Sequence, residues 1–163
     1  MKTVYCDSNF WVRLFVEFPE SRAIRAEMEG LRAGDELCLP LTWLHRVEVT
    51  NAFNLLVFQS RAGRFPRVTS EQAAIALENF RELASGNSFA VNQPLYAADL
   101  EPQVVALSER HTARHGFRAY DLLHVSSALL LDCATFWSFD QKASKLAALE
   151  GLRVRKVAAR KLD

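Results

Sequence analysis

Four acidic residues lie in strongly apolar parts of the sequence, where a charge needs an explanation. Asp7 follows the apolar run Val4-Tyr5-Cys6, and Asp140 ends the apolar segment TFWSFD. Asp121 opens the stretch DLLHVSSALLL, and Glu48 lies within LHRVEVTNAF. At about 4 Å and an effective dielectric near 20, each like-charged pair costs about 4 kcal/mol. A shared pocket of such acids therefore requires protonation or a neutralising cation.

Oxygen ligands of this kind suit Mg²⁺ or Mn²⁺ rather than zinc. One or two such ions activate a water molecule and stabilise the leaving oxygen during phosphodiester cleavage. The sequence shows no Ser/His/Asp arrangement that indicates a side-chain nucleophile. The residue types therefore predict metal-dependent hydrolysis of a phosphodiester.

Each acid also has a structural interpretation. Asp7 and Asp140 can cap the helices that follow them, and Asp121 can be a first-turn acid favoured by the helix dipole. Glu48 can pair with Arg46 or with an arginine of a neighbouring helix. For any one acid alone the structural interpretation is favoured. The four together favour a site, because topology places two of them at one edge of the predicted sheet.

The pattern of apolar residues predicts strands alternating with helices. Strands are expected at 3–6, 36–41, 88–91, 135–139 and 153–157, and helices at 9–16, 20–33, 42–61, 69–84, 100–115, 119–133 and 141–149. Within helix 42–61 we expect Leu44, Val47, Phe53 and Leu55 to point inward. Alternating elements predict a parallel sheet covered on both faces. The expected fold is α/β, a three-layer α/β/α sandwich with a five-stranded parallel sheet, in one domain spanning residues 1–163.

The position of the acids follows from this fold. Ligands of open α/β sheets bind outside the carboxyl ends of the strands. Asp7 and Asp140 come directly after the first and fourth predicted strands, so both are expected at that edge.

Composition narrows the class of protein. The chain has 163 residues, the size of one domain, and its 20 basic and 19 acidic residues almost cancel. Net charge therefore predicts no partner. The three cysteines are far apart and form no CxxC motif, which favours buried thiols in a reducing cytosol. No apolar stretch is long enough to span a membrane, so we expect a soluble cytoplasmic protein.

Four segments of the sequence resemble the acidic motifs of PIN-domain ribonucleases, especially VapC-type toxins of toxin–antitoxin pairs. These segments are VYCDSN, VEVTNAF, RAYDLLHVSSALLL and FWSFDQKASKLAALEGLRV. The resemblance implies a PIN fold and a Mg²⁺- or Mn²⁺-dependent endoribonuclease that cleaves RNA. It also implies a protein that is usually a homodimer and is inhibited by a cognate antitoxin.

The resemblance also implies roles for individual residues. Asp7, Glu48, Asp121 and Asp140 match the catalytic acids. Asp7 and Asp121 are expected as direct metal ligands, Asp140 as a ligand directly or through water, and Glu48 as the group that orients the attacking water. Ser8 and Ser138 match positions whose hydroxyl groups support the acids.

Basic and histidine residues near these acids have two interpretations each. Arg118 can bind an RNA phosphate beside the metal or pair with an acid. His124 lies one turn after Asp121, and we interpret it as a packed helix histidine rather than a catalytic group. The remaining histidines, His45, His111 and His115, show no convincing metal-ligand spacing.

Three alternative functions are open at this point. A housekeeping PIN nuclease in RNA maturation would share all the motifs. A phosphate-accepting signalling domain would need paired acids after its first strand, whereas YCDSN offers one. A non-catalytic α/β binding module is disfavoured by the full set of four acids.

Overall fold

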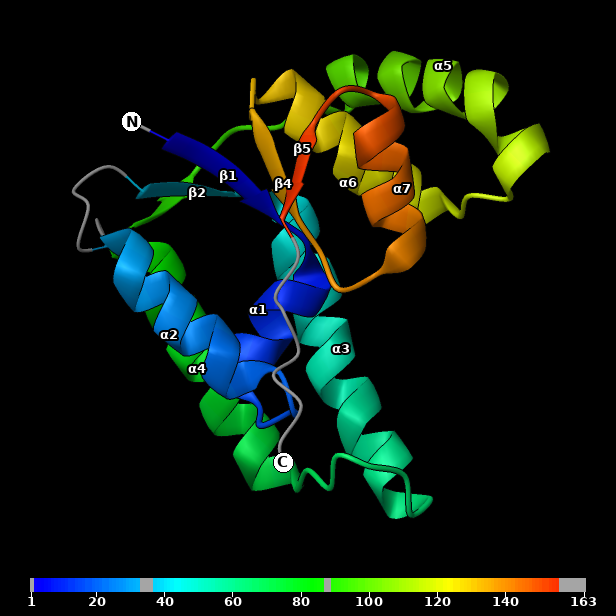
Figure 1. Ribbon diagram of the computed structural model, residues 1–163. Helices are drawn as coiled ribbons and strands as arrows, with labels where there is room; N and C mark the ends of the chain where they lie inside the picture. Colours follow the sequence, from blue (N-terminus) through cyan, green and yellow to red (C-terminus); the bar gives the residue numbers. More distant parts are fainter. Residues whose placement is uncertain (1, 33–36, 87–88, 156–163) are drawn as a thin grey trace, which may run out of the picture.

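The computed structural model describes residues 2–32, 37–86 and 89–155, which form a parallel sheet with helices on both faces (Figure 1). The sheet has five strands in the order β3-β2-β1-β4-β5. The strands are β1 (Lys2–Cys6), β2 (Leu37–Leu41), β3 (Ala90–Asn92), β4 (Thr135–Trp137) and β5 (Arg153–Arg155). The helices are α1 (Ser8–Phe15), α2 (Ser21–Arg32), α3 (Trp43–Arg61), α4 (Ser70–Ser85), α5 (Ala97–His115), α6 (Ala119–Leu130) and α7 (Gln141–Leu149). The predicted α/β fold with a five-stranded parallel sheet is confirmed.

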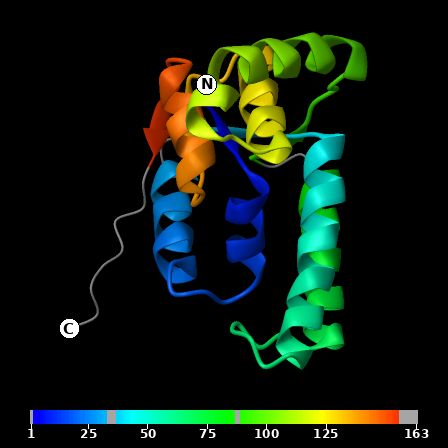
Figure 2. The same ribbon diagram turned by 90° about the vertical axis from the view of Figure 1, so that its right-hand side faces the viewer.

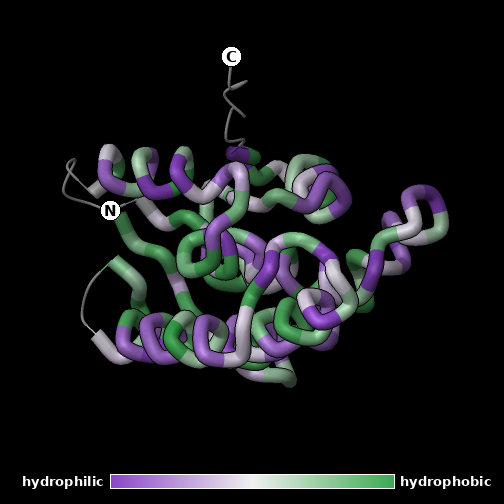
Figure 3. Tube along the Cα trace, turned by 90° about the horizontal axis from the view of Figure 1, so that it is seen from below, coloured by the Kyte–Doolittle hydropathy of each residue, from purple (hydrophilic) through white to green (hydrophobic). Residues whose placement is uncertain are grey.

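Two hydrophobic cores lie on opposite faces of the sheet, because successive strand residues point to opposite sides. In β1, Val4 and Cys6 belong to the core shared with α1 to α4, whereas Tyr5 belongs to the core shared with α5 to α7. In β4, Trp137 and Phe136 divide in the same way. Along the trace, the helices alternate between polar and apolar residues (Figure 3). The division of β1 and β4 between two cores shows that these strands are covered on both faces.

Some predicted boundaries differ from the observed ones. Helix α6 ends at Leu130 rather than at residue 133, because the chain turns there. The N–H of Cys133 donates to the carbonyl of Ala128 (3.0 Å), and Asp132 adopts a φ of 51°. Helix α5 begins three residues earlier than expected, at Ala97. The predicted element ends at residues 33, 36, 88 and 157 lie outside the described residues.

The prediction for the inward face of α3 is only half right. Leu44 and Phe53 are buried, but Val47 is 55% exposed and Leu55 is 46% exposed. The helix extends away from the sheet (Figure 2) and buries one stripe that includes Val49. Val47 and Leu55 lie outside that stripe, so this part of the prediction is wrong. No helix in the described ranges is long and apolar enough to cross a membrane.

Candidate active site

Two of the predicted acids lie at the same edge of the sheet. Asp7 directly follows β1 and is the N-cap of α1, and Asp140 follows β4 and is the N-cap of α7. Strands β1 and β4 are adjacent and parallel, with Cys6 opposite Trp137. Their carboxyl ends therefore bring the two segments together, as the sequence predicts.

A buried serine links these two acids. Ser138 Oγ donates to Asp7 Oδ2 (2.5 Å) and accepts from the backbone N–H of Asp140 (2.9 Å). The other oxygen of Asp7, Oδ1, accepts from the N–H of Phe10 (3.0 Å) in the first turn of α1. Asp7 is only 3% exposed. Its carboxylate is therefore held in one orientation by two elements of the fold.

Glu48 and His124 form the second part of the site. Glu48 lies on α3 and His124 on α6, and His124 Nε2 contacts Glu48 Oε2. Ser8 Oγ lies 3.4 Å from the same nitrogen, and Tyr5 Oη lies 2.9 Å from Nδ1. A carboxylate only accepts hydrogen bonds, so Nε2 carries the hydrogen. His124 thus connects Glu48 to β1 and α1.

This contact changes the interpretation of both residues. Glu48 pairs with a histidine rather than with Arg46, whose guanidinium instead donates to Asn92 Oδ1 (3.0 Å). His124 is a buried helix histidine, as expected, but it is packed against a candidate catalytic acid. The spacing of three residues after Asp121, on one helix face, is the signal that could have placed it in the site.

Asp121 lies in the first turn of α6 and is 7% exposed. Its Oδ2 accepts from the backbone N–H of Arg118 (2.8 Å), so it satisfies a free donor at the helix start. No described residue donates to its other oxygen. The side chain of Arg118 is exposed, and its predicted contact with RNA stays a prediction.

The net effect of burial and neighbouring groups is to raise the pKa of Asp7 but to lower the pKa of Glu48. Burial raises the pKa of Asp7, and the Glu48 carboxylate raises it further, although His124, Ser138 and the N–H of Phe10 oppose this. Burial also favours a higher pKa for Glu48, but the hydrogen bond and charge of His124 outweigh it and lower the pKa. The negative charge of Asp7 is therefore the less favourable of the two, and a cation nearby would stabilise it.

The acids fit a hard divalent ion by their chemistry, because all four offer carboxylate oxygens. In the described part of the chain, however, no three His, Cys, Asp or Glu side chains are grouped closely enough to hold a metal ion. Glu48 is turned to His124, and each aspartate bonds to the start of its own helix. The assignment of Asp7, Asp121 and Asp140 as metal ligands remains a prediction.

His45 fixes the distance between the two halves of the site. It is fully buried, its Nε2 donates to the carbonyl of Cys6 (2.9 Å), and its Nδ1 accepts from the N–H of Thr42 (3.1 Å). Cys6 directly precedes Asp7, and Thr42 is the N-cap of the helix that carries Glu48. Burial lowers the pKa of His45 to about 3, with contributions from His124 and Arg46. The imidazole is therefore neutral at pH 7.

The other residues considered from the sequence have structural contacts. All three cysteines are buried and free, as predicted. His111 and Arg110 on α5 both bond to Glu150, which follows α7. His115 lies 3.2 Å from Lys145 Nζ.

Comparisons with known proteins agree with this architecture. Among solved structures, the chain is similar to VapC20 from Mycobacterium tuberculosis, described as a sarcin-ricin loop cleaving toxin. The TM-score is 0.60 at 19% identity, covering 94% of this chain and 99% of that chain. It is also similar to VapBC2 from Rickettsia felis bound to a promoter DNA fragment, with a TM-score of 0.61 at 14% identity, covering 94% and 97%. No curated protein sequence matches the chain. A family model described as PIN domain matches residues 4–149, and the chain therefore belongs to the PIN domain family.

Proposed function

We propose that the chain is a metal-dependent endoribonuclease and the toxin of a VapBC-type pair. One observation carries the proposal. Glu48 contacts His124 Nε2, which lies 3.4 Å from the hydroxyl of Ser8, the residue after Asp7, and burial and the Glu48 charge both raise the pKa of Asp7. A fold that only needed a helix cap at position 7 would be equally served by a neutral Asn or Ser.

The proposal gives each residue a task. Asp7, Asp121 and Asp140 would hold Mg²⁺ or Mn²⁺, and the bound ion would supply an activated water and stabilise the leaving oxygen. Glu48, oriented by His124, accepts a hydrogen bond from the attacking water. Ser138 keeps the Asp7 carboxylate in place.

RNA is the substrate that the proposal implies, and it is supported by two features. One similar structure is described as a toxin that cleaves the sarcin-ricin loop. In addition, Arg118 is exposed directly beside Asp121, where its guanidinium can bind an RNA phosphate.

The proposal is tested by cleavage of RNA in Mg²⁺ or Mn²⁺ by the wild type and by the variants Asp7→Asn and Asp121→Asn. Both variants keep the size of the side chain and remove its charge, and we expect at least a hundredfold loss of rate for each. Asp132→Asn is the matched control, because Asp132 is exposed, precedes β4 rather than following it, and has a positive φ that Asn tolerates. Cleavage by both variants at the wild-type rate would refute the site.

A toxin requires a protein that inhibits it. The similar Rickettsia structure is a VapBC2 complex, and exposed apolar side chains on α3, Val47, Leu55 and Phe58, offer a surface for an antitoxin or a second copy of the chain. We expect expression to arrest growth and a co-expressed antitoxin to relieve the arrest. Normal growth with active nuclease would instead indicate a housekeeping enzyme. The homodimer and the cytoplasmic location stay predictions.

A further inference from the structure

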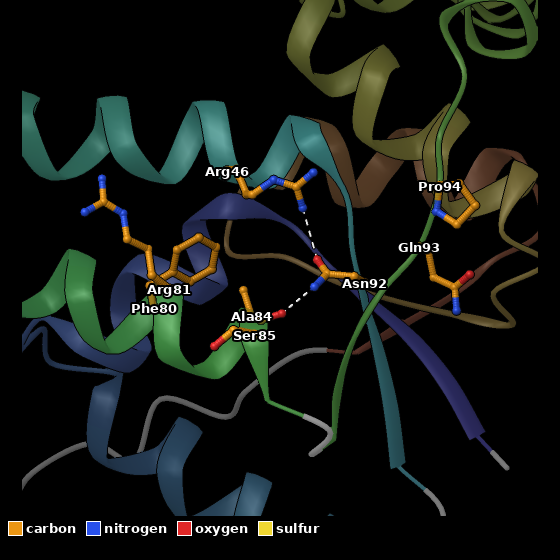
Figure 4. A pocket seen from close by; sticks show the side chains of 8 residues that line it. All are labelled: Arg46, Phe80, Arg81, Ala84, Ser85, Asn92, Gln93 and Pro94. Atoms are coloured by element: carbon orange, nitrogen blue, oxygen red, sulfur yellow. Dashed lines mark hydrogen bonds between the residues drawn. The ribbon is translucent and has the colours of Figure 1, made fainter.

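A pocket lies on the other side of α3 from Glu48. Its volume is about 620 Å³, and it is formed by the first turns of α3, the last turns of α4 and the residues that follow β3 (Figure 4). Its polar lining includes Arg46, Arg81, Ser85 and Asn92. None of these residues belongs to the site described above.

The charge of this pocket is positive. The described residues that line it include two arginines and no acid. Arg46 is held in place, because its Nη1 donates to Asn92 Oδ1 (3.0 Å) and Asn92 in turn donates to the carbonyl of Ala84. Arg81 is exposed, and its Nη1 lies 3.5 Å from Oε2 of Glu78, one turn away on the surface of α4. Exposed pairs of this kind are weak, so both guanidinium groups can bind an anion.

The pocket lies on the same edge of the sheet as the acids. Asn92 ends β3, and Asp7 follows β1, with β2 between them. Two strand spacings amount to roughly 10 Å. On α3, Arg46 and Glu48 are two residues apart, which places them about 200° apart around the helix axis. An RNA strand that runs from the acids across the first turn of α3 therefore reaches the pocket within a few nucleotides.

We propose that this pocket is a phosphate-binding subsite for the RNA backbone, one or a few nucleotides from the cleaved bond, with Arg46 and Arg81 as its cations. This inference rests on the proposed function and extends it to the substrate. A guanidinium fixed by a neighbouring amide is suited to phosphate, because its remaining donors are already oriented.

Binding in EDTA, where cleavage does not occur, tests the subsite directly. Fluorescence anisotropy of a labelled single-stranded RNA is measured over a range of salt concentrations. Loss of one phosphate contact makes the slope of log K against log salt shallower by about 0.7, which is about fivefold weaker binding at 0.1 M salt. We expect this change for Arg46→Gln and again for Arg81→Gln, whereas Arg46→Lys keeps the slope.

The matched control is Arg153→Gln. Arg153 is exposed and carries the same charge, but it lies in β5, at the opposite edge of the sheet from β3. Its binding and slope should equal those of the wild type. If both pocket variants bind RNA as tightly as this control, the subsite is refuted.

Tryptophan fluorescence gives an independent readout. Trp11 and Trp137 are fully buried, whereas Trp43 is 38% exposed and lies one turn before Arg46 on α3. Its indole is fixed by a hydrogen bond to the carbonyl of Leu95 (2.8 Å). RNA in the pocket should protect Trp43 from acrylamide quenching. Protection that persists unchanged in the Arg46→Gln, Arg81→Gln double variant would refute the subsite.

The experiment separates this inference from the proposed function. Cleavage that remains sensitive to Asp7→Asn, together with pocket variants that bind RNA like the control, refutes the subsite and leaves the nuclease intact. A higher KM with unchanged kcat in the pocket variants supports the subsite. A wild-type chain that neither binds nor cleaves RNA refutes both.

Discussion

Mild acid should destabilise the protein through His45. The imidazole is fully buried, and its two nitrogens already bond to the carbonyl of Cys6 and the N–H of Thr42. Protonation would place an N–H on Nδ1 directly against the N–H of Thr42, so the folded state resists it. Burial is the main reason that the pKa of His45 is lowered to about 3, and the charges of His124 and Arg46 lower it further.

The size of the effect follows from linkage. The unfolded chain binds the proton with a pKa near 6.5, so between about pH 6.5 and 3 the unfolded state holds one more proton than the folded state. The free energy of unfolding then falls by about 1.4 kcal/mol per pH unit, or about 2.7 kcal/mol by pH 4.5. For a chain of this length this corresponds to a fall in Tm of about 5–11 °C.

Urea unfolding at several pH values between 7.5 and 4.5 measures this slope. The comparison variant is His45→Gln, whose amide can still accept from Thr42 and donate to Cys6 but does not titrate. The variant should be less stable at pH 7. As the pH falls, its free energy of unfolding should decrease by about 1.4 kcal/mol per pH unit less than that of the wild type. Equal slopes for the variant and the wild type would refute the assignment of the low pKa to His45.

Three further predictions concern the acids and their partners. Asp7→Asn should raise Tm in EDTA, because burial and the neighbouring carboxylate disfavour the charged acid, and should abolish the stabilisation by Mg²⁺. Under the proposed function, Mg²⁺ at a hundredfold excess over its dissociation constant would stabilise the wild type by about 2.7 kcal/mol, so Asp7→Asn should have a higher Tm than the wild type in EDTA and a lower Tm in Mg²⁺. Glu150→Gln should cost about 1 kcal/mol at pH 7, because it weakens the contacts with Arg110 and His111. Burial favours a higher pKa for Glu150, but these contacts lower it, so the difference from the wild type should be present above about pH 4.3 and vanish at lower pH in urea titrations. Ser138→Ala should cost about 1–3 kcal/mol and slow RNA cleavage, because it leaves Asp7 Oδ2 and a backbone N–H unpaired, whereas Ser138→Thr should retain both properties.

The parts of the fold that depend on local patterns were predictable from the sequence. Helix α7 has the predicted bounds, because Asp140 marks its start and Gly151 follows its end. The edge of the sheet at which Asp7 and Asp140 lie follows from the order of strands and helices alone. These features depend on residues close together in the sequence or on general topology.

The parts that depend on long-range packing were not predictable. Val47 and Leu55 are apolar yet exposed, because α3 extends beyond the sheet and only one of its sides is covered. The contact between Glu48 and His124 joins residues 76 positions apart. A single sequence does not indicate which of several candidate partners a carboxylate contacts.

The structural and catalytic interpretations of the acids are compatible rather than exclusive. Asp121 and Asp140 each use one carboxylate oxygen for a helix start, which leaves the other free of donors from the described residues. Asp7 uses both oxygens, but a carboxylate oxygen has two lone pairs and can accept a second interaction. Each cap restricts the rotation of its side chain and so reduces the entropy lost when an ion binds. Under the proposed function, the caps therefore orient the metal ligands in advance, and removing a cap donor should weaken Mg²⁺ binding even where the acid itself is retained.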